Sequence, residues 1–225
     1  MIDSPAYTVV IPAYNASRYL GETLRSVLQQ SVPPAKVLVV DDGSTDDTTG
    51  VAKTFGDVVD VITTSNQGSG PATSAGIREV KTTIVATVDS DDLWRPDKIE
   101  RQLAILTDRK TDVDAVLTKM EPFGRLDLKT ANIETSAWSR STLLTWTATF
   151  DRVGPVENMG NGYGEMIDWF ARARDAGVRF HVLDEVLARR RIHPDSLSFI
   201  ARKRRNADYL QAAVRALRRK RDAGP

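Results

Sequence analysis

We predict an α/β fold in which a mainly parallel β-sheet is flanked by helices, and two observations lead to it. Short apolar runs rich in β-branched residues recur through the first half of the chain, and amphipathic stretches of helix length separate them. This alternation is typical of parallel strands joined by crossover helices. The expected strands are 7–11, 36–40, 58–63 and 83–88, and the expected helices between them are 17–30, 46–55 and 70–80.

The expected helices have recognisable starts and ends. Ser17 is placed to cap the first helix, and Pro33-Pro34 closes the stretch that follows it. Residues 92–96 lead into a fourth helix, because apolar residues then repeat at helical spacing. The buried stripe of the first helix is Leu20, Leu24, Val27 and Leu28, and that of the fourth is Ile99, Leu103 and Leu106.

From about Asp112 the pattern becomes less regular. Strand-like pieces over 113–118 and 143–150 precede a helix over 165–176. The last stretch, 202–221, has apolar residues on one face and arginines on the others, which predicts a basic amphipathic helix. We therefore expect one domain over 1–198, with halves 1–110 and 111–198, followed by a basic C-terminal helix within 199–225.

Composition and charge exclude several classes of protein. The 225 residues contain no cysteine and two histidines, which excludes disulfide scaffolds, zinc ribbons and thiol nucleophiles. No apolar stretch is long enough for a membrane span and no leader pattern is present, so we expect a soluble, cytoplasmic protein. The net charge of +1 hides an asymmetry, since residues 187–225 carry 12 Lys+Arg and 3 Asp+Glu. The basic end and the acidic remainder therefore have different roles.

Polar residues follow each of the four expected strands. The carboxyl ends of parallel strands meet at one edge of a sheet, where ligands bind. Five carboxylates facing one another there would raise each other's pKa and favour a divalent cation with oxygen ligands, magnesium or manganese, and so a diphosphate ligand. A single Asp-Gly-Ser is more often a turn, but several such clusters at one edge indicate a site. The clusters are Pro12 to Asn15, Asp41 to Ser44, Asn66 to Gly68, and Asp89 to Asp92.

Other nucleotide and hydrolase motifs are absent. Gly68-Ser69-Gly70 begins a dinucleotide fingerprint, but Thr73 replaces the third glycine and the pair follows the third strand rather than the first. The chain has neither a P-loop nor a G-x-S-x-G elbow. A nucleotidyltransferase, which also uses carboxylates and a metal, remains an alternative.

Four segments together resemble the family 2 glycosyltransferases of the GT-A fold: YTVVIPAYN (7–15), VVDDGSTD (39–46), NQG (66–68) and VDSDD (88–92). The resemblance implies an enzyme of the hexosyltransferase type that uses a nucleotide-diphospho-sugar, with UDP the favoured nucleotide, and inverts the anomeric centre. It implies that Mn²⁺ or Mg²⁺ is held by Asp89 and Asp91, with Asp92 a weaker candidate. Tyr14 would stack on the base and Asp42 would accept its N–H. The donor-binding residues implied are Pro12, Ala13, Tyr14, Asn15, Asp42, Asn66, Gly68, Asp89, Ser90, Asp91, Arg191 and His193.

The segment GEMIDW (164–169) resembles the acidic motif that supplies the general base of this family. Met166 stands where many members carry the base, so the role passes to Glu165 or Asp168, with Glu165 favoured because a helix N-terminus faces the crevice. These acids are neighbours on a helix surface, and the helix dipole alone also favours acids there. The segment RIHPDS (191–196) resembles a family segment whose basic side chains approach the diphosphate or the metal. Thr73-Ser74 stands where relatives often carry Arg-Asn, so one cation expected near the nucleotide-sugar is absent.

The acceptor, the sugar and the oligomeric state are not encoded in a readable pattern. Trp138, Trp146 and Trp169 are candidates for stacking on a sugar ring, although core packing explains them equally well. The basic end is compatible with an anionic membrane or a lipid-phosphate acceptor, or with a non-catalytic binding module, although a solvated face is the simpler explanation. Nucleic acid is not expected as a partner, because no aromatic residues alternate with the arginines.

Overall fold

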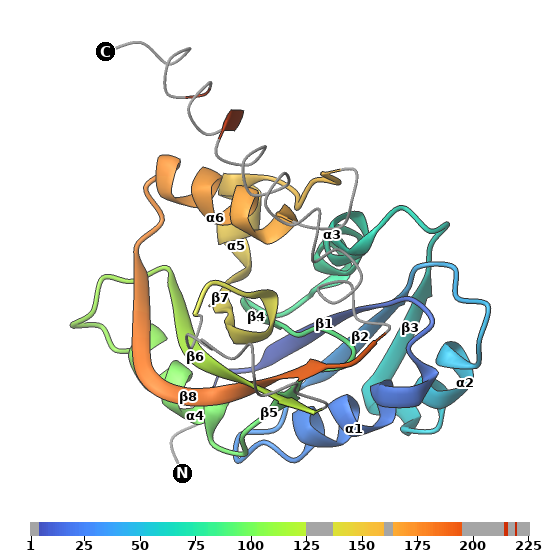
Figure 1. The fold of residues 1–225 in the computed structure, drawn as a ribbon. Helices are drawn as coiled ribbons and strands as arrows, with labels where there is room; N and C mark the ends of the chain where they lie inside the picture. The colour runs from blue at the N-terminus through green and yellow to red at the C-terminus, as the bar shows by residue number, and fades with distance from the viewer. Residues whose placement is uncertain (1–4, 125–136, 160–163, 195–213, 216–218, 220–225) are drawn as a thin grey trace, which may run out of the picture.

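One sheet of eight strands organises the molecule in the computed structural model, which describes residues 5–124, 137–159, 164–194, 214, 215 and 219. The strand order is β3-β2-β1-β4-β7-β6-β8-β5. Figure 1 shows α1 and α4 on one side of this sheet and α3 and α6 on the other. The mixed α/β fold with helices on both faces confirms the predicted class.

The first half is the predicted parallel sheet with its crossover helices. β1 pairs in parallel with both β2 and β4, and β2 pairs in parallel with β3. The predicted ranges are confirmed to within a few residues. The elements are β1 (Tyr7–Ala13), α1 (Ser17–Leu28), β2 (Lys36–Asp41), α2 (Thr48–Lys53), η1 (Gly56–Val58), β3 (Val59–Thr63), α3 (Ser69–Glu79), β4 (Ile84–Thr87) and α4 (Lys98–Leu106).

Two apolar layers cover the two faces of this sheet. Val9 and Ile11 of β1 pack with α1 and α4, whereas Val10, between them, packs with α3 and α6. This alternation follows from the period of two residues in a strand. Helix α3 lies so close to the sheet that a Cβ at Gly76 would approach Val10 Cγ1 to 2.5 Å. Only glycine fits at this crossing of α3 over β1.

The start of α1 differs from the prediction. Ser17 is the first helical residue, and Ala16 at the cap position makes no side-chain cap. The backbone N–H groups at the start of α1 are satisfied instead by two side chains at and just before the start of α2. Ala16 N–H donates to Thr48 Oγ1 at 2.8 Å, and Ser17 N–H donates to Asp46 Oδ2 at 3.0 Å.

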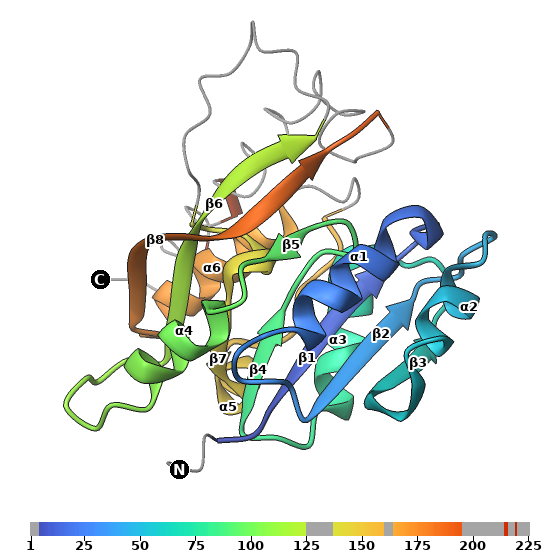
Figure 2. The same ribbon diagram turned by 90° about the horizontal axis from the view of Figure 1, so that it is seen from below.

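The second half continues the same sheet and contains more strand than expected. β6 and β8 pair in parallel along most of their length, and β7 joins β4 to β6 in antiparallel pairing. Figure 2 shows β6 and β8 running side by side. The elements are β5 (Leu93–Trp94), β6 (Ala115–Gly124), η3 (Arg140–Thr142), β7 (Leu144–Trp146), α5 (Thr147–Val153), α6 (Glu165–Asp175) and β8 (Phe180–Ile192).

Two expectations for the second half were wrong. The stretch 143–150 is a strand only in β7, and its remainder forms the start of α5. Strand β8 was not predicted, because charged residues interrupt its apolar pattern and only Leu187 and Ala188 are buried.

Of the expected basic helix 202–221, Val214, Arg215 and Arg219 are helical, and the rest lies outside the described residues. No helix in the described ranges has the length and apolar character needed to cross a membrane.

Candidate functional site

The carboxyl end of β2 supplies two aspartates that organise neighbouring loops. Asp42 is buried and accepts three hydrogen bonds, from Thr64 Oγ1 at 2.7 Å, Gln67 N–H at 2.9 Å and Gly68 N–H at 2.7 Å. Asn66 in this loop has a φ of 42° and Gly68 a φ of 101°. Asp42 therefore holds the loop that contains the predicted Asn66 and Gly68 in a left-handed turn.

The Asp41 carboxylate stabilises the turn that directly follows β2. It accepts hydrogen bonds from Ser44 N–H at 2.9 Å and Thr49 Oγ1 at 2.6 Å. Burial acts to raise the pKa of Asp41, but these hydrogen bonds outweigh burial and lower it. The expected face-to-face group of five carboxylates is thus divided, because Asp41 and Asp42 are taken up by nearby turns.

The turn after β1 presents one open aromatic ring. Tyr14 is 48% exposed, whereas Pro12 and Ala13 are buried within β1. Asn15, with a φ of 48°, fixes the turn: its N–H donates to Ser44 Oγ at 2.9 Å and its Oδ1 accepts from Thr45 N–H at 2.8 Å. The backbone of this turn is therefore rigid, and the face of Tyr14 is accessible.

Three aspartates follow β4 and act on one another. Asp91 accepts from His193 Nε2 at 2.9 Å, and Asp92 accepts from Ser141 Oγ at 2.5 Å and from Arg191 N–H at 3.0 Å. Burial raises the pKa of Asp91, and the Asp89 carboxylate raises it further. The pKa of Asp92 is raised in the same way, by burial and then by Asp91 and Asp89. Three acidic side chains so close together favour a bound cation.

The predicted basic residues of β8 do reach this group. Arg191 donates through Nε to the Asp91 backbone oxygen at 2.9 Å and through a terminal nitrogen to Glu22 at 2.7 Å. Its guanidinium lies 4.6 Å from the centre of the Tyr19 ring, and the His193 ring also lies 4.6 Å from that ring. Ser90 contributes a backbone oxygen, which accepts from Thr23 Oγ1 at 2.9 Å. Asp195 and Ser196 of the same motif lie outside the described residues.

A metal ion is implied by the resemblance, and the donors present suit one. Asp89 and Asp91 offer carboxylate oxygens, which Mg²⁺ and Mn²⁺ prefer, and the raised pKa of Asp91 reflects charge that a cation would neutralise. Asp89 is paired with Arg140 and Asp91 with His193. Among the described residues no three acidic or histidine side chains are arranged as a closed metal site. The open donor set matches an ion that completes its coordination with water and a diphosphate.

Arg140 of η3 was not predicted from the sequence, and it lies between two candidate site residues, Asp89 and Glu165. Its guanidinium pairs with Asp89, lies 3.4 Å from Ser69 Oγ, and lies 3.8 Å from Glu165 Oε2. Its side chain is 6% exposed. The signal available in the sequence is that Arg140 is the one charged residue in the stretch 136–150.

The two candidate bases of α6 have different surroundings. Glu165 is 2% exposed and accepts one hydrogen bond, from Ser69 Oγ to Oε2 at 2.6 Å. Its Oε1 is buried and has no hydrogen-bond partner among the described residues. Met166, at the position expected for the base, is buried in the apolar layer.

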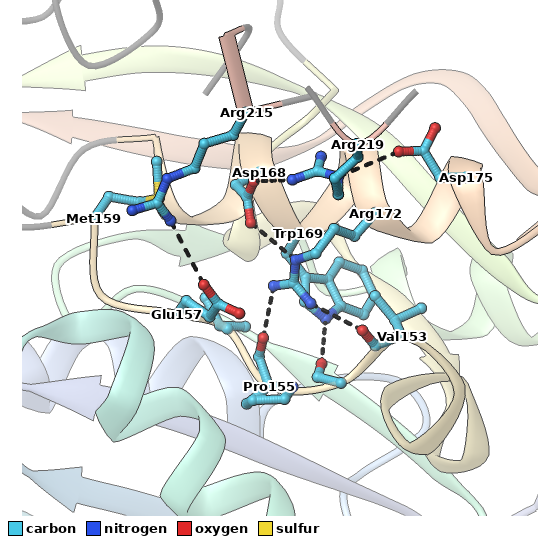
Figure 3. A network of polar contacts seen from close by, with 12 residues as sticks. Val153, Pro155, Glu157, Met159, Asp168, Trp169, Arg172, Asp175, Arg215 and Arg219 are labelled. Atoms are coloured by element: carbon cyan, nitrogen blue, oxygen red, sulfur yellow. Dashed lines mark hydrogen bonds and ion pairs between the residues drawn. The ribbon is translucent and has the colours of Figure 1, made fainter. Parts of the chain in front are cut away.

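Asp168 is enclosed by two arginines. Figure 3 shows its two oxygens accepting from Arg172 Nε at 2.8 Å and from Arg219 at 2.9 Å. Burial acts to raise the pKa of Asp168, but the hydrogen bonds and charges of these two arginines outweigh it and lower the pKa. Arg172 also binds the backbone oxygens of Val153 and Pro155, so Asp168 belongs to a structural network.

The three tryptophans considered for sugar stacking pack within the protein. Trp169 is fully buried, lies 4.6 Å from the Phe150 ring and donates to the Gly154 oxygen at 3.1 Å. Trp138 packs edge-on against Phe170 at 5.2 Å. Trp146 is partly buried against the layer that contains α1. Core packing therefore accounts for all three.

Comparisons with known proteins agree with this geometry. The family model described as Glycosyl transferase family 2 matches residues 8–151, more than half of the chain. An uncharacterized glycosyltransferase of Rickettsia prowazekii is 36% identical over 105 residues, which cover 47% of this chain and 33% of that protein. The chain thus spans well under half of the length of the curated relatives it matches.

Two solved structures share the fold. The mannosyltransferase PcManGT from Pyrobaculum calidifontis, in complex with GDP-Man and Mn²⁺, has a TM-score of 0.73 at 22% identity over 96% of this chain and 65% of that chain. S. aureus TarS 1-349, in complex with UDP-GlcNAc, has a TM-score of 0.69 at 22% identity over 86% and 60% of the two chains. The family match over more than half of the sequence shows that this chain belongs to glycosyl transferase family 2.

Proposed function

We propose that this chain transfers a sugar from a nucleotide-diphospho-sugar to an acceptor hydroxyl, with inversion at the anomeric carbon. The observation that carries the proposal is the meeting of two acids with different surroundings, Asp89 and the buried Glu165, on either side of Arg140. Asp89 can help to hold a metal ion at the donor diphosphate, and Glu165 can take the proton of the acceptor hydroxyl. Such a division of roles suits a single in-line displacement without a covalent intermediate.

The donor would bind along the carboxyl ends of β1, β2 and β4. Tyr14 offers an open ring for stacking on the base, and the Asp42 loop borders the same edge. UDP is the favoured nucleotide, in line with the UDP-GlcNAc complex of TarS, while the GDP-Man complex of PcManGT keeps a guanine donor among the candidates. The sugar is a hexose in this proposal.

Asp89 and Asp91 would hold Mn²⁺ or Mg²⁺ at the diphosphate. When bound, the metal supplies positive charge that stabilises the departing diphosphate. Arg191 lies against Asp91 and adds positive charge on the same side, and His193 Nε2 lies 2.9 Å from the Asp91 carboxylate. PcManGT was solved with Mn²⁺, which supports a divalent ion here without choosing between the two metals.

Glu165 is the proposed general base. Its Oε1 has no hydrogen-bond partner among the described residues and can accept the proton of the acceptor hydroxyl, while Oε2 is held by Ser69. Asp168 is unsuited to this role because two arginines occupy its oxygens. In the in-line attack, Glu165 would take the hydroxyl proton as the acceptor oxygen bonds to the anomeric carbon, and the bond from that carbon to the diphosphate oxygen would break to release the nucleoside diphosphate.

A donor screen tests the proposal. The purified chain is heated with UDP- and GDP-sugars, each with Mn²⁺, with Mg²⁺ or with EDTA, and the melting temperature is recorded. Donors that stabilise the protein only with metal are then assayed for release of the nucleoside diphosphate in the presence of hydroxyl acceptors. Release of pyrophosphate from a nucleoside triphosphate would instead support a nucleotidyltransferase. No stabilisation by any nucleotide would contradict the proposal.

A further inference from the structure

Arg140 carries a buried charge that the proposed donor and acceptor roles do not by themselves require. Its side chain is 6% exposed, and its Nε has no hydrogen-bond partner among the described residues. Both terminal nitrogens point at acids, one at Asp89 and the other toward Glu165 Oε2 at 3.8 Å. A guanidinium in this environment is stable only where opposite charge compensates its loss of water.

Glu165 has the greater need for this cation. Asp89 keeps 37% of its side chain exposed, whereas Glu165 keeps 2%. Among the described residues, Arg140 is the one cation within 4 Å of Glu165. A single hydroxyl, that of Ser69, is the other polar contact of its carboxylate. A buried carboxylate with one neutral donor is poorly compensated, and Arg140 supplies the opposite charge beside it.

The backbone around Arg140 is fixed by side chains from several elements. The Arg140 oxygen accepts from Thr87 Oγ1 at 2.8 Å, and the Ser141 oxygen accepts from Trp94 Nε1 at 2.7 Å. The Thr142 oxygen accepts from the buried Gln102 at 2.8 Å. The short helix η3 is therefore held by β4, β5 and α4, which places the guanidinium with little freedom.

The surroundings also determine which Glu165 oxygen is available. Ser69 donates a hydrogen bond to Oε2, and the Arg140 guanidinium lies nearest to the same oxygen. A Cβ at Gly70 would lie 3.0 Å from Glu165 Cδ and 2.9 Å from the Glu157 backbone oxygen, so glycine leaves the space that this carboxylate occupies. The result is a carboxylate with one oxygen bound and one oxygen free for a proton.

We propose that Arg140 is the positioning residue of the general base: it pairs with the buried Glu165 carboxylate through Oε2, which leaves Oε1 for the acceptor, and it links this acid to Asp89 on the donor side. The inference rests on the proposed glycosyl transfer and deepens it. Because the same guanidinium contacts both acids, the two sides of the reaction centre are held at a fixed relation by one side chain.

A double-mutant cycle tests the pairing independently of activity. The variants are Arg140→Met, Glu165→Gln and the two combined, with Arg152→Met as control. Arg152 is 42% exposed and pairs with Asp114 rather than with a site residue. Denaturant unfolding should show a clear loss of stability for Arg140→Met and a small loss for Glu165→Gln. The double variant should regain most of the loss, because a neutral amide needs no counter-charge. The Arg152→Met midpoint should stay near that of the wild type.

Kinetics distinguish positioning from a purely structural role. For Arg140→Met we expect kcat to fall at least about a hundredfold and the donor KM to change less than about threefold. Arg140→Lys, which retains the charge, should recover kcat to within about tenfold of the wild type. Additive stability effects, a double variant that does not fold, or an undiminished kcat in Arg140→Met would overturn the inference. A wild type without transfer activity would contradict the proposed function, while the stability cycle would still decide the Arg140–Glu165 pair.

Discussion

The two acids in the first turn of α6 show how the contacts of a residue decide its role. Glu165 and Asp168 are both almost fully buried. In the part of the chain that the structure describes, Glu165 retains an oxygen without a hydrogen-bond partner, whereas both oxygens of Asp168 bind arginines. A base needs a free lone pair and a structural anchor does not. The spacing of three residues, by contrast, is the same for either role.

Replacement of Glu165 by Gln is therefore expected to lower kcat by about 10²- to 10⁴-fold, the range that general base catalysis contributes. Gln keeps the size of the side chain, and donor binding should change little because the proposed role of Glu165 is toward the acceptor. Single-turnover transfer and nucleotide titrations measure the two effects. Wild-type turnover in Glu165→Gln would show that the base lies elsewhere.

Asp91 permits a prediction on the donor side. Its raised pKa means that the folded state holds the ionised carboxylate at a cost, which increases as pH rises through that pKa. Asp91→Asn removes this charge, so the variant should fold with equal or greater stability at neutral pH. Transfer should nevertheless fall at least about a hundredfold, because the variant loses a carboxylate proposed to hold the metal ion that stabilises the departing diphosphate.

Calorimetry with Mn²⁺ and UDP provides the second measurement for Asp91. The wild type should bind the metal and nucleotide together, and Asp91→Asn should show little heat. Asp97→Asn is the matched control, since Asp97 pairs with Arg101 next to α4 and does not contact Asp91 or Asp89. Full metal-dependent turnover in Asp91→Asn would contradict the metal assignment.

At the scale of elements, α6 is fastened to its surroundings by one network of arginines. Arg172 joins Asp168 to the backbone of Val153 and Pro155, and Arg219 joins it to the C-terminal part of the chain (Figure 3). Trp169 adds a hydrogen bond to the Gly154 oxygen. The orientation of α6, and with it that of Glu165 at its first turn, depends on these contacts.

Asp168→Asn is expected to destabilise the protein by about 3 kcal/mol at neutral pH, because two arginines lose a buried counter-charge. The pKa of Asp168 is lowered in the folded protein, so its contribution is present above the unfolded value of about 3.9 and is lost as pH falls through the folded pKa. The difference between wild type and variant should therefore shrink below about pH 4.

Denaturant unfolding at several pH values checks this, with Asp175→Asn as control. Asp175 is on the same helix and pairs with the same Arg219, but it is 34% exposed, so its loss should cost at most about 1 kcal/mol. An Asp168→Asn effect as small as that of Asp175→Asn, or one unchanged at acidic pH, would contradict a buried ion pair.

At the scale of the whole molecule, the elements that could be predicted from the sequence are those whose local apolar pattern agrees with their place in the sheet. The strands 7–13, 36–41 and 84–87 are apolar on both faces and helices follow them, so their edge and its aspartates could be placed from the sequence. Strand β8 could not, because Arg189 to Arg191 are favoured there by partners on β6 and near Asp91 rather than by local pattern.

The candidate site was predictable to the same extent. The aspartates after β4 and the histidine at 193 follow from motif resemblance, and the structure brings them together. Arg140 could not be found in this way, because its role arises from contacts with Asp89 and Glu165 that are 51 and 25 residues away in the chain. The choice between Glu165 and Asp168 likewise depends on Arg219, which is distant in sequence.

The stability of the whole molecule depends on a buried polar group where its two halves meet. Gln102 of α4 donates to the backbone oxygens of Val116 at 2.7 Å and Thr142 at 2.8 Å. Lys98, fully buried, donates to Gln102 Oε1 at 2.7 Å, and its Nζ lies 4.0 Å from the centre of the Trp94 ring. Burial lowers the pKa of Lys98 well below its usual value.

This lysine makes global stability dependent on pH. Between the lowered folded pKa of Lys98 and the unfolded value of about 10.4, the unfolded chain binds one more proton than the folded one, so stability rises with pH by up to about 1.4 kcal/mol per unit. Lys98→Met keeps the volume and removes this dependence. Relative to the wild type, the variant should therefore be most favoured at low pH and lose that advantage as pH rises to 9.5. Lys36→Met, on the exposed end of β2, should shift stability by a constant amount over the same range, and a similarly constant difference for Lys98→Met would show that the buried lysine is charged in the folded protein.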